Sequence, residues 1–214
     1  MTTTTSSSRN PIKGERLFDR TFARLLAATL RQNGLTMGIY GVCLILVTVC
    51  PAFLEACRRQ GIVPIAGMEL TTAEDIHIVC LFETLEAAMD FDAFVDSKRI
   101  RIKNRTDIFG EQIICNANDE PLGQEEFLLS NATALPLEKA VESARAHGAV
   151  VYPAHVDRQA NGILTTLGGM PPSPVFTAVE YHDGGRIAEL CETHSALAGL
   201  ETVICSDAHY LWDI

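Results

Sequence analysis

An Asp and a His two positions apart, Asp207 and His209, carry the strongest chemical signal in the chain. They follow a short apolar run, residues 202–205, which is typical of a buried strand, so both side chains would stand at its carboxyl end. A carboxylate and an imidazole at this spacing can bind one divalent metal ion or two neighbouring ones. Because Asp-x-His is common by chance, the pair gains meaning only if other strands deliver similar groups.

Three further segments place potential metal ligands beside predicted strands. His155 follows the apolar run 150–154, Glu69 lies near the end of the run 62–70, and His77 lies between two isoleucines of another apolar run. The plain alternative is a histidine satisfied by local hydrogen bonds, or a half-buried strand histidine without chemistry. In α/β folds, functional side chains gather at the carboxyl ends of strands. We therefore expect these groups and the Asp-x-His pair to converge on one site.

The ordered set resembles the PHP (polymerase and histidinol phosphatase) family of metal-dependent phosphoesterases. The matching stretches are residues 67–72 followed by His77, then residues 153–155 and residues 206–209, and the resemblance runs from about Cys50 to the last residue. It implies an α/β fold of the PHP type, a distorted (β/α)7 barrel with atypical or incomplete N-terminal strands. It also implies divalent metal ions, two or three in the intact family site, and the mixed ligands suit Zn, Mn or Fe better than Mg.

The resemblance assigns roles to individual residues. The implied metal ligands are Glu69, His77, His155, Asp207 and His209. Glu69 would bridge two metal ions, and Glu69, His155 and Asp207 would be the catalytic residues. Arg158, which closely follows His155, is the candidate for binding the substrate phosphate. The implied reaction is hydrolysis of a phosphate ester by a metal-bound hydroxide.

Residues 1–49 depart from the family pattern. The family carries a His-x-His pair on its first strand and a Thr-Asp-His ending on its second, whereas residues 1–49 contain no histidine. We interpret them as an atypical leader of the kind that a shifted reading frame would produce. Residues 50–214 would then be a PHP-like domain, truncated at its C-terminus. The alternative function is a catalytically inactive PHP fragment that binds metal or is purely structural.

An uncharged apolar stretch, residues 33–54, suggests a second alternative, a membrane-anchored protein. Three glycines and Pro51 interrupt it, a buried strand is the plain alternative, and we expect no membrane partner. Seven cysteines, an odd number without paired Cys-x-x-Cys motifs, predict free thiols and a cytoplasmic location.

The charge balance limits the partners. A net charge of −10 argues against a broad nucleic-acid surface, but it does not exclude a nucleotide held by metal ions. The expected partner is a phosphorylated small molecule, a nucleotide or a nucleic-acid end, and neither the substrate nor the oligomeric state follows from the sequence. A basic run, residues 98–105, is interpreted as a solvated face or as a strip facing phosphate.

Local patterns predict the remaining elements. Residues 137–147 have helical character and end before Gly148, residues 108–114 and 118–123 are typical of two short strands around a turn, and residues 167–174 form a rigid loop. The length of 214 residues is typical of one domain.

Overall fold

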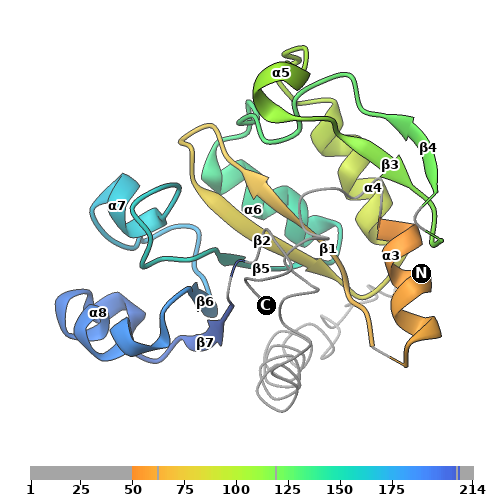
Figure 1. The fold of residues 1–214 in the computed structure, drawn as a ribbon. Helices are drawn as coiled ribbons and strands as arrows, with labels where there is room; N and C mark the ends of the chain where they lie inside the picture. Colours follow the sequence, from red (N-terminus) through yellow and green to blue (C-terminus); the bar gives the residue numbers. More distant parts are fainter. Residues whose placement is uncertain (1–49, 62, 119, 206, 208–214) are drawn as a thin grey trace, which may run out of the picture.

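The computed structural model describes residues 50–61, 63–118, 120–205 and 207, which form a mixed α/β structure (Figure 1). The predicted leader 1–49, the greater part of the apolar stretch 33–54, and His209 lie outside the described residues. Cys50 to Leu54, the end of that stretch, begin helix α3 (Cys50–Arg59). None of the helices in the described ranges is long and apolar enough to cross a bilayer.

A three-stranded sheet in the order β1-β2-β5 forms the centre of the molecule. Its strands are β1 (Ala66–Thr71), β2 (His77–Phe82) and β5 (Val150–Pro153), and β2 runs antiparallel to both neighbours. Thr71 therefore pairs with His77. The first residue of β2 thus lies at the end of the sheet where β1 and β5 have their C-terminal residues.

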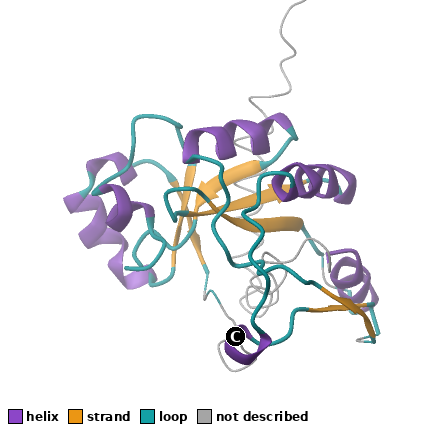
Figure 2. Ribbon diagram, turned by 90° about the horizontal axis from the view of Figure 1, so that it is seen from above, coloured by secondary structure: helices purple, strands orange, loops and turns teal. Residues whose placement is uncertain are grey.

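Alternation along the strands gives the sheet two different faces. One face packs against α3, α4 (Leu85–Asp96) and α6 (Leu137–Ala146), and its buried side chains include Met68, Leu70, Ile78, Cys80, Phe82 and Val151. Figures 1 and 2 show α4 and α6 together on that face. The other face carries Val79, Leu81, Val150 and Tyr152. Glu69 and His77 share the register of that second face, away from the helices.

A parallel pair of strands, β6 (Ala178–Tyr181) and β7 (Glu201–Ile204), lies beside β5. The helices α7 (Ile163–Leu167) and α8 (Ile187–Thr193) lie on the same side of the molecule as β6 and β7 (Figure 1). The short 3-10 turns η2 (Gly184–Arg186) and η3 (Ser195–Leu197) precede and follow α8. The backbone N–H of Val156 donates to the carbonyl oxygen of Glu180, 2.8 Å away. The turn after β5 is therefore attached directly to β6.

The predicted α/β class is confirmed, but no closed barrel forms among the described strands, which make three separate sheets. Neighbouring parallel strands need a crossover of about a dozen or more residues. The loop 72–76 between β1 and β2 is too short for such a crossover, so the two strands pair antiparallel as a hairpin. The helix predicted at 137–147 is confirmed as α6, and it is followed by Gly148 at a φ of 85°.

The predicted strand 108–114 is only partly correct. Ile108 and Phe109 belong to a helical turn, α5 (Thr106–Phe109), and the extended segments are β3 (Ile113–Cys115) and β4 (Pro121–Gln124). Gly110, the C-cap of α5, has a φ of 76°, which lies outside the range of a regular strand and interrupts the predicted run. Most of the basic run is a solvated face, because Arg101, Lys103 and Arg105 are ion-paired with Asp96, Glu126 and Asp107.

Candidate metal centre

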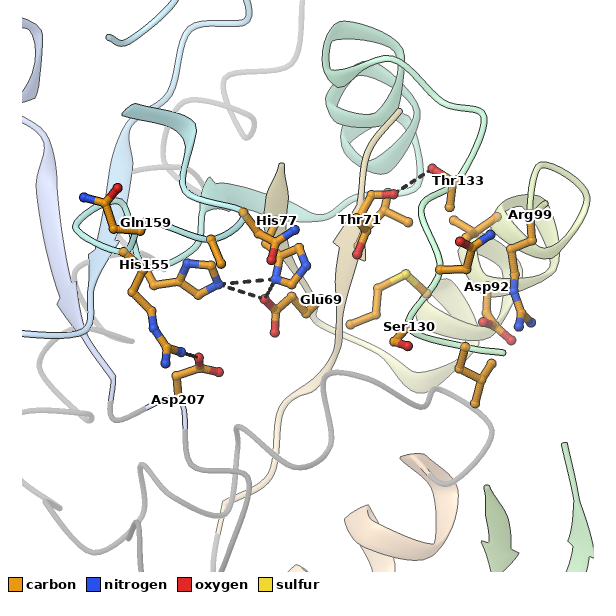
Figure 3. A pocket seen from close by; sticks show the side chains of 18 residues that line it. Glu69, Thr71, His77, Asp92, Arg99, Ser130, Thr133, His155, Gln159 and Asp207 are labelled. Carbon is orange, nitrogen blue, oxygen red and sulfur yellow. Dashed lines mark hydrogen bonds and ion pairs between the residues drawn. The ribbon is translucent and has the colours of Figure 1, made fainter. Parts of the chain in front are cut away.

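Glu69, His77 and His155 converge at one edge of the central sheet, where they form a possible metal-binding group. Their ligand atoms all lie within 4.8 Å of one another. His155 Nε2 is 3.3 Å from Glu69 Oε1 and 3.3 Å from His77 Nδ1, and His77 Nδ1 also contacts Glu69 Oε1 (Figure 3). The antiparallel hairpin brings Glu69 and His77 to the same face, and the end of β5 adds His155.

The donor set fits a divalent cation. Metal ligands at ~2.0–2.1 Å in a tetrahedral arrangement lie about 3.3 Å from one another. Two separations in this group, from His155 Nε2 to Glu69 Oε1 and to His77 Nδ1, have that value. Two imidazole nitrogens and one carboxylate oxygen suit Zn, Mn or Fe. Three of the five predicted ligands, Glu69, His77 and His155, therefore meet in a geometry that can hold such an ion.

Electrostatics keeps Glu69 ionised. Burial alone would raise the pKa of Glu69, but hydrogen bonds from His155 and His77 and the charges of these rings lower it to about 2. Burial alone would lower the pKa of His155, but its hydrogen bond with Glu69 and the negative charges of Glu69, Asp207 and Glu180 raise it. A cation that took the place of the proton on His155 would experience the same negative field.

The loop after β5 is held in a conformation that L-amino acids rarely adopt. In this loop His155 has a φ of 27° and Asn161 a φ of 58°. Such residues persist only where the surroundings fix them, and they cluster at functional sites. Gly162 closes the loop, because a Cβ there would lie 2.4 Å from the carbonyl oxygen of Arg158. The close approach explains why this position is a glycine.

Asp157 attaches this loop to the end of β6. Its two carboxylate oxygens accept the backbone N–H groups of His182 and Asp183, each at 2.8 Å. Arg186 Nη1 donates to the carbonyl oxygen of Asp157, 2.6 Å away. The side chain is buried in the protein and satisfied by these bonds. Asp157 therefore fixes the backbone on which His155 and Arg158 stand.

Glu180 is a further residue of this site, and it is not among the site residues predicted from the sequence. Its Oε1 accepts the backbone N–H of His155 at 3.3 Å, and its side chain is buried. Burial and the negative charge of Glu69 raise the pKa of Glu180 to about 8. The signal was present in the sequence, because Glu180 lies near the end of a short apolar run, as Glu69 does. Asp157 had no comparable signal, since its partners are backbone groups.

The other predicted site residues are placed as follows. Asp207 and Arg158 line the same pocket as the metal-binding group and form an ion pair with each other. Asp207 is not among the three residues of that group, and its role as a ligand stays a prediction. His209 lies outside the described residues, so its convergence with His155 stays a prediction as well.

The pocket has a volume of about 620 Å³. The metal-binding group, Arg158 and Asp207 lie at one end, and Asp92, Arg99 and Ser130 lie at the other (Figure 3). Arg99 is the member of the predicted basic run that lines this pocket. A cavity of this size accommodates an organic ligand, which is considerably larger than a phosphate group.

Comparison of the sequence with known protein families and with curated proteins gives no match. Among solved structures, the chain is similar to a lesion-specific endonuclease from Pyrococcus furiosus, with 14% identity and a TM-score of 0.47, over 76% of this chain and 38% of that chain. It is also similar to endonuclease Q in complex with a 27-mer duplex carrying an abasic lesion at the active site. The identity is 14% and the TM-score 0.46, over 81% of this chain and 42% of that chain. The chain spans about two fifths of the length of these proteins, and likeness at this level identifies neither a family nor an activity.

Proposed function

We propose that this chain is a metal-dependent phosphoesterase of the PHP type. The observation that carries the proposal is the convergence of Glu69, His77 and His155 in one pocket with an arginine and a further carboxylate, Arg158 and Asp207. The ordered family motifs in the sequence support the same assignment. The substrate class is a phosphate ester of a nucleotide, a nucleic-acid end or a small alcohol.

The metal would be held by His155 Nε2, His77 Nδ1 and a Glu69 oxygen, with Asp207 and His209 as further ligands. When bound, divalent ions supply an activated water and positive charge for the phosphoryl oxygens. Glu69 contributes a carboxylate that stays ionised at every working pH, because its pKa is about 2. Glu180 and Asp157 hold the backbone of the His155 loop, so the imidazole is oriented before substrate arrives.

Arg158 is proposed to bind the phosphoryl oxygens. Its guanidinium is paired with Asp207 in the structure. If Asp207 were held as a metal ligand, the Arg158 guanidinium would be available to donate paired hydrogen bonds to phosphate in the pocket. The overall reaction breaks the bond from phosphorus to the alcohol oxygen and forms one to the oxygen of water, and a proton from that water ends on the released alcohol.

The test is hydrolysis of 4-nitrophenyl phosphate and bis(4-nitrophenyl) phosphate by the chelator-treated protein after Mn or Zn is added back. We expect metal-dependent turnover that Glu69→Gln and His155→Ala abolish. His182→Ala is the matched control, because His182 is exposed and contacts Asp157 through its backbone only. Turnover that survives both site substitutions would show that another part of the chain carries the activity.

The second candidate is a PHP fragment that binds metal without turnover. The observation in its favour is the lack of histidine in residues 1–49, where the family carries further imidazole ligands. Metal affinity falls as ligands are lost. Isothermal titration with Mn and Zn separates the two candidates: metal binding that depends on His155, together with no hydrolysis of either ester, supports the fragment.

A further inference from the structure

The far end of the candidate pocket has its own polar wall, separate from the metal-binding group. It is built by α4 and by the loop 128–133, and its lining residues include Asp92, Val95, Arg99, Leu129, Ser130 and Asn131. Figure 3 shows Asp92, Arg99 and Ser130 on the opposite side of Glu69 and His77 from Asp207. A phosphoester whose phosphate lies at the metal end would direct its alcohol part towards this wall.

Arg99 is already engaged by the protein. Its Nη1 donates to Asp96 Oδ1 at 3.1 Å, and its Nη2 lies 3.5 Å from the carbonyl oxygen of Leu128. The second carboxylate oxygen of Asp96 accepts from Arg101 at 2.6 Å. Arg99 is therefore a fixed part of the wall, held by the Asp96 carboxylate that it shares with Arg101, and it is poorly suited to bind a second phosphate.

Asp92 is the unused polar group at this end. None of the described residues donates a hydrogen bond to its carboxylate. Burial raises the pKa of Asp92, the nearby charges of Asp96 and Glu125 raise it further, and the charge of Arg99 lowers it. The local field is thus more negative than positive, and it favours a partner that donates hydrogen bonds or carries positive charge.

We propose that Asp92 is a specificity-determining residue that accepts a hydrogen bond from a hydroxyl or amino group on the alcohol part of the substrate. The same carboxylate disfavours alcohol parts that carry a second anionic group. The proposal rests on the proposed phosphoesterase function, since it takes the metal end of the pocket as the phosphate site. It narrows the substrates to phosphate esters of polar, non-anionic alcohols.

The experiment uses alkyl phosphates of graded chain length that end in a methyl, hydroxyl, ammonium or carboxylate group, with kcat/KM measured for each. The native protein should prefer hydroxyl and ammonium ends and discriminate against carboxylate. Asp92→Asn should reduce the preference for ammonium over methyl by roughly 10-fold to 100-fold, the range expected for a hydrogen bond to a charged group.

Asp90→Asn is the matched control, because Asp90 is an exposed carboxylate of the same helix and does not line the pocket. It should leave every ratio unchanged. If Asp92→Asn also leaves the ratios unchanged while hydrolysis is robust, the role of Asp92 is refuted and the phosphoesterase function stands.

A binding measurement keeps the proposal testable in a chain without turnover. Non-hydrolysable alkyl phosphonates with the same four end groups are titrated into the native protein and Asp92→Asn in the presence of Mn. Tighter binding of the ammonium-ended compound by the native protein alone supports the role of Asp92, even if the phosphoesterase function has failed. Equal binding by both proteins overturns it.

Discussion

The backbone N–H of His77 donates a hydrogen bond to the carbonyl oxygen of Asn161, 3.0 Å away. Asn161 ends the loop that begins at His155, and its side-chain Nδ2 donates to the carbonyl oxygen of Asp75 at 3.1 Å. The loop that carries one imidazole therefore fixes the start of the strand that carries the other. The two ring nitrogens, from His155 and His77, lie 3.3 Å apart.

Two substitutions of Asn161 should distinguish the effect of its backbone conformation from the effect of its side-chain hydrogen bond. Asn161 has a φ of 58°, which glycine adopts freely and which costs other L-residues about 1–2 kcal/mol. We expect Asn161→Ala to lower the free energy of unfolding more than Asn161→Gly, and both to weaken metal binding because His77 is less well held. Urea unfolding without metal and titration with Mn measure the two effects.

Gln159→Ala is the control for Asn161, since Gln159 is an exposed residue of the same loop. It should change neither the free energy of unfolding nor the affinity for Mn. Equal destabilisation by Asn161→Ala and Asn161→Gly would mean that the left-handed conformation contributes nothing.

Metal binding should stabilise the fold, whether or not the protein turns over substrate. A ligand that binds only the folded state raises the free energy of unfolding by RT ln(1 + [L]/Kd), which is about 2.7 kcal/mol at 100 times Kd. Thermal unfolding of the chelator-treated protein should therefore shift upward when Zn or Mn is added. His155→Ala should lose this shift and His182→Ala should keep it. A shift of equal size in His155→Ala would place the bound metal elsewhere.

The sequence predicted the metal-binding group because each of its members interrupts or ends an apolar run. Glu69, His77 and His155 are visible in this way, and alternation along the strands is a local property. It did not predict that His77 comes from the amino end of its strand, since the direction of β2 depends on the short loop that makes a hairpin. Hydrogen bonds from Asp157 to backbone groups across the chain leave no pattern in the sequence.

Gly162→Ala should disturb the loop between His155 and Asn161. An added Cβ would lie 2.4 Å from the carbonyl oxygen of Arg158, and the contact is with backbone, which cannot rotate away as a side chain can. We expect a loss of about 1–3 kcal/mol in the free energy of unfolding, the usual cost of overpacking. Metal affinity should fall as well, since His155 moves with the loop. Gly123→Ala is the control, because a Cβ there meets nothing within 4 Å.

Asp92→Asn should stabilise the protein at neutral pH. The pKa of Asp92 is raised in the folded state, first by burial and then by Asp96 and Glu125, so folding favours its protonated form. Well below the ordinary value of 3.8 the carboxyl is neutral in both states and the two proteins should be equally stable. As the pH rises through 3.8 and then the folded pKa, the native protein loses stability relative to the Asn variant.

Urea unfolding of the native protein and Asp92→Asn across this range measures the difference. An advantage of the Asn variant that grows between acidic and neutral pH, and then levels off, is the expected outcome. A difference that is constant with pH would contradict it, because packing changes do not titrate. Asp92 lines the pocket, and none of the described residues donates a hydrogen bond to its carboxylate. A carboxylate that lowers stability at such a position is what a ligand-binding role predicts, because binding sites often trade stability for function.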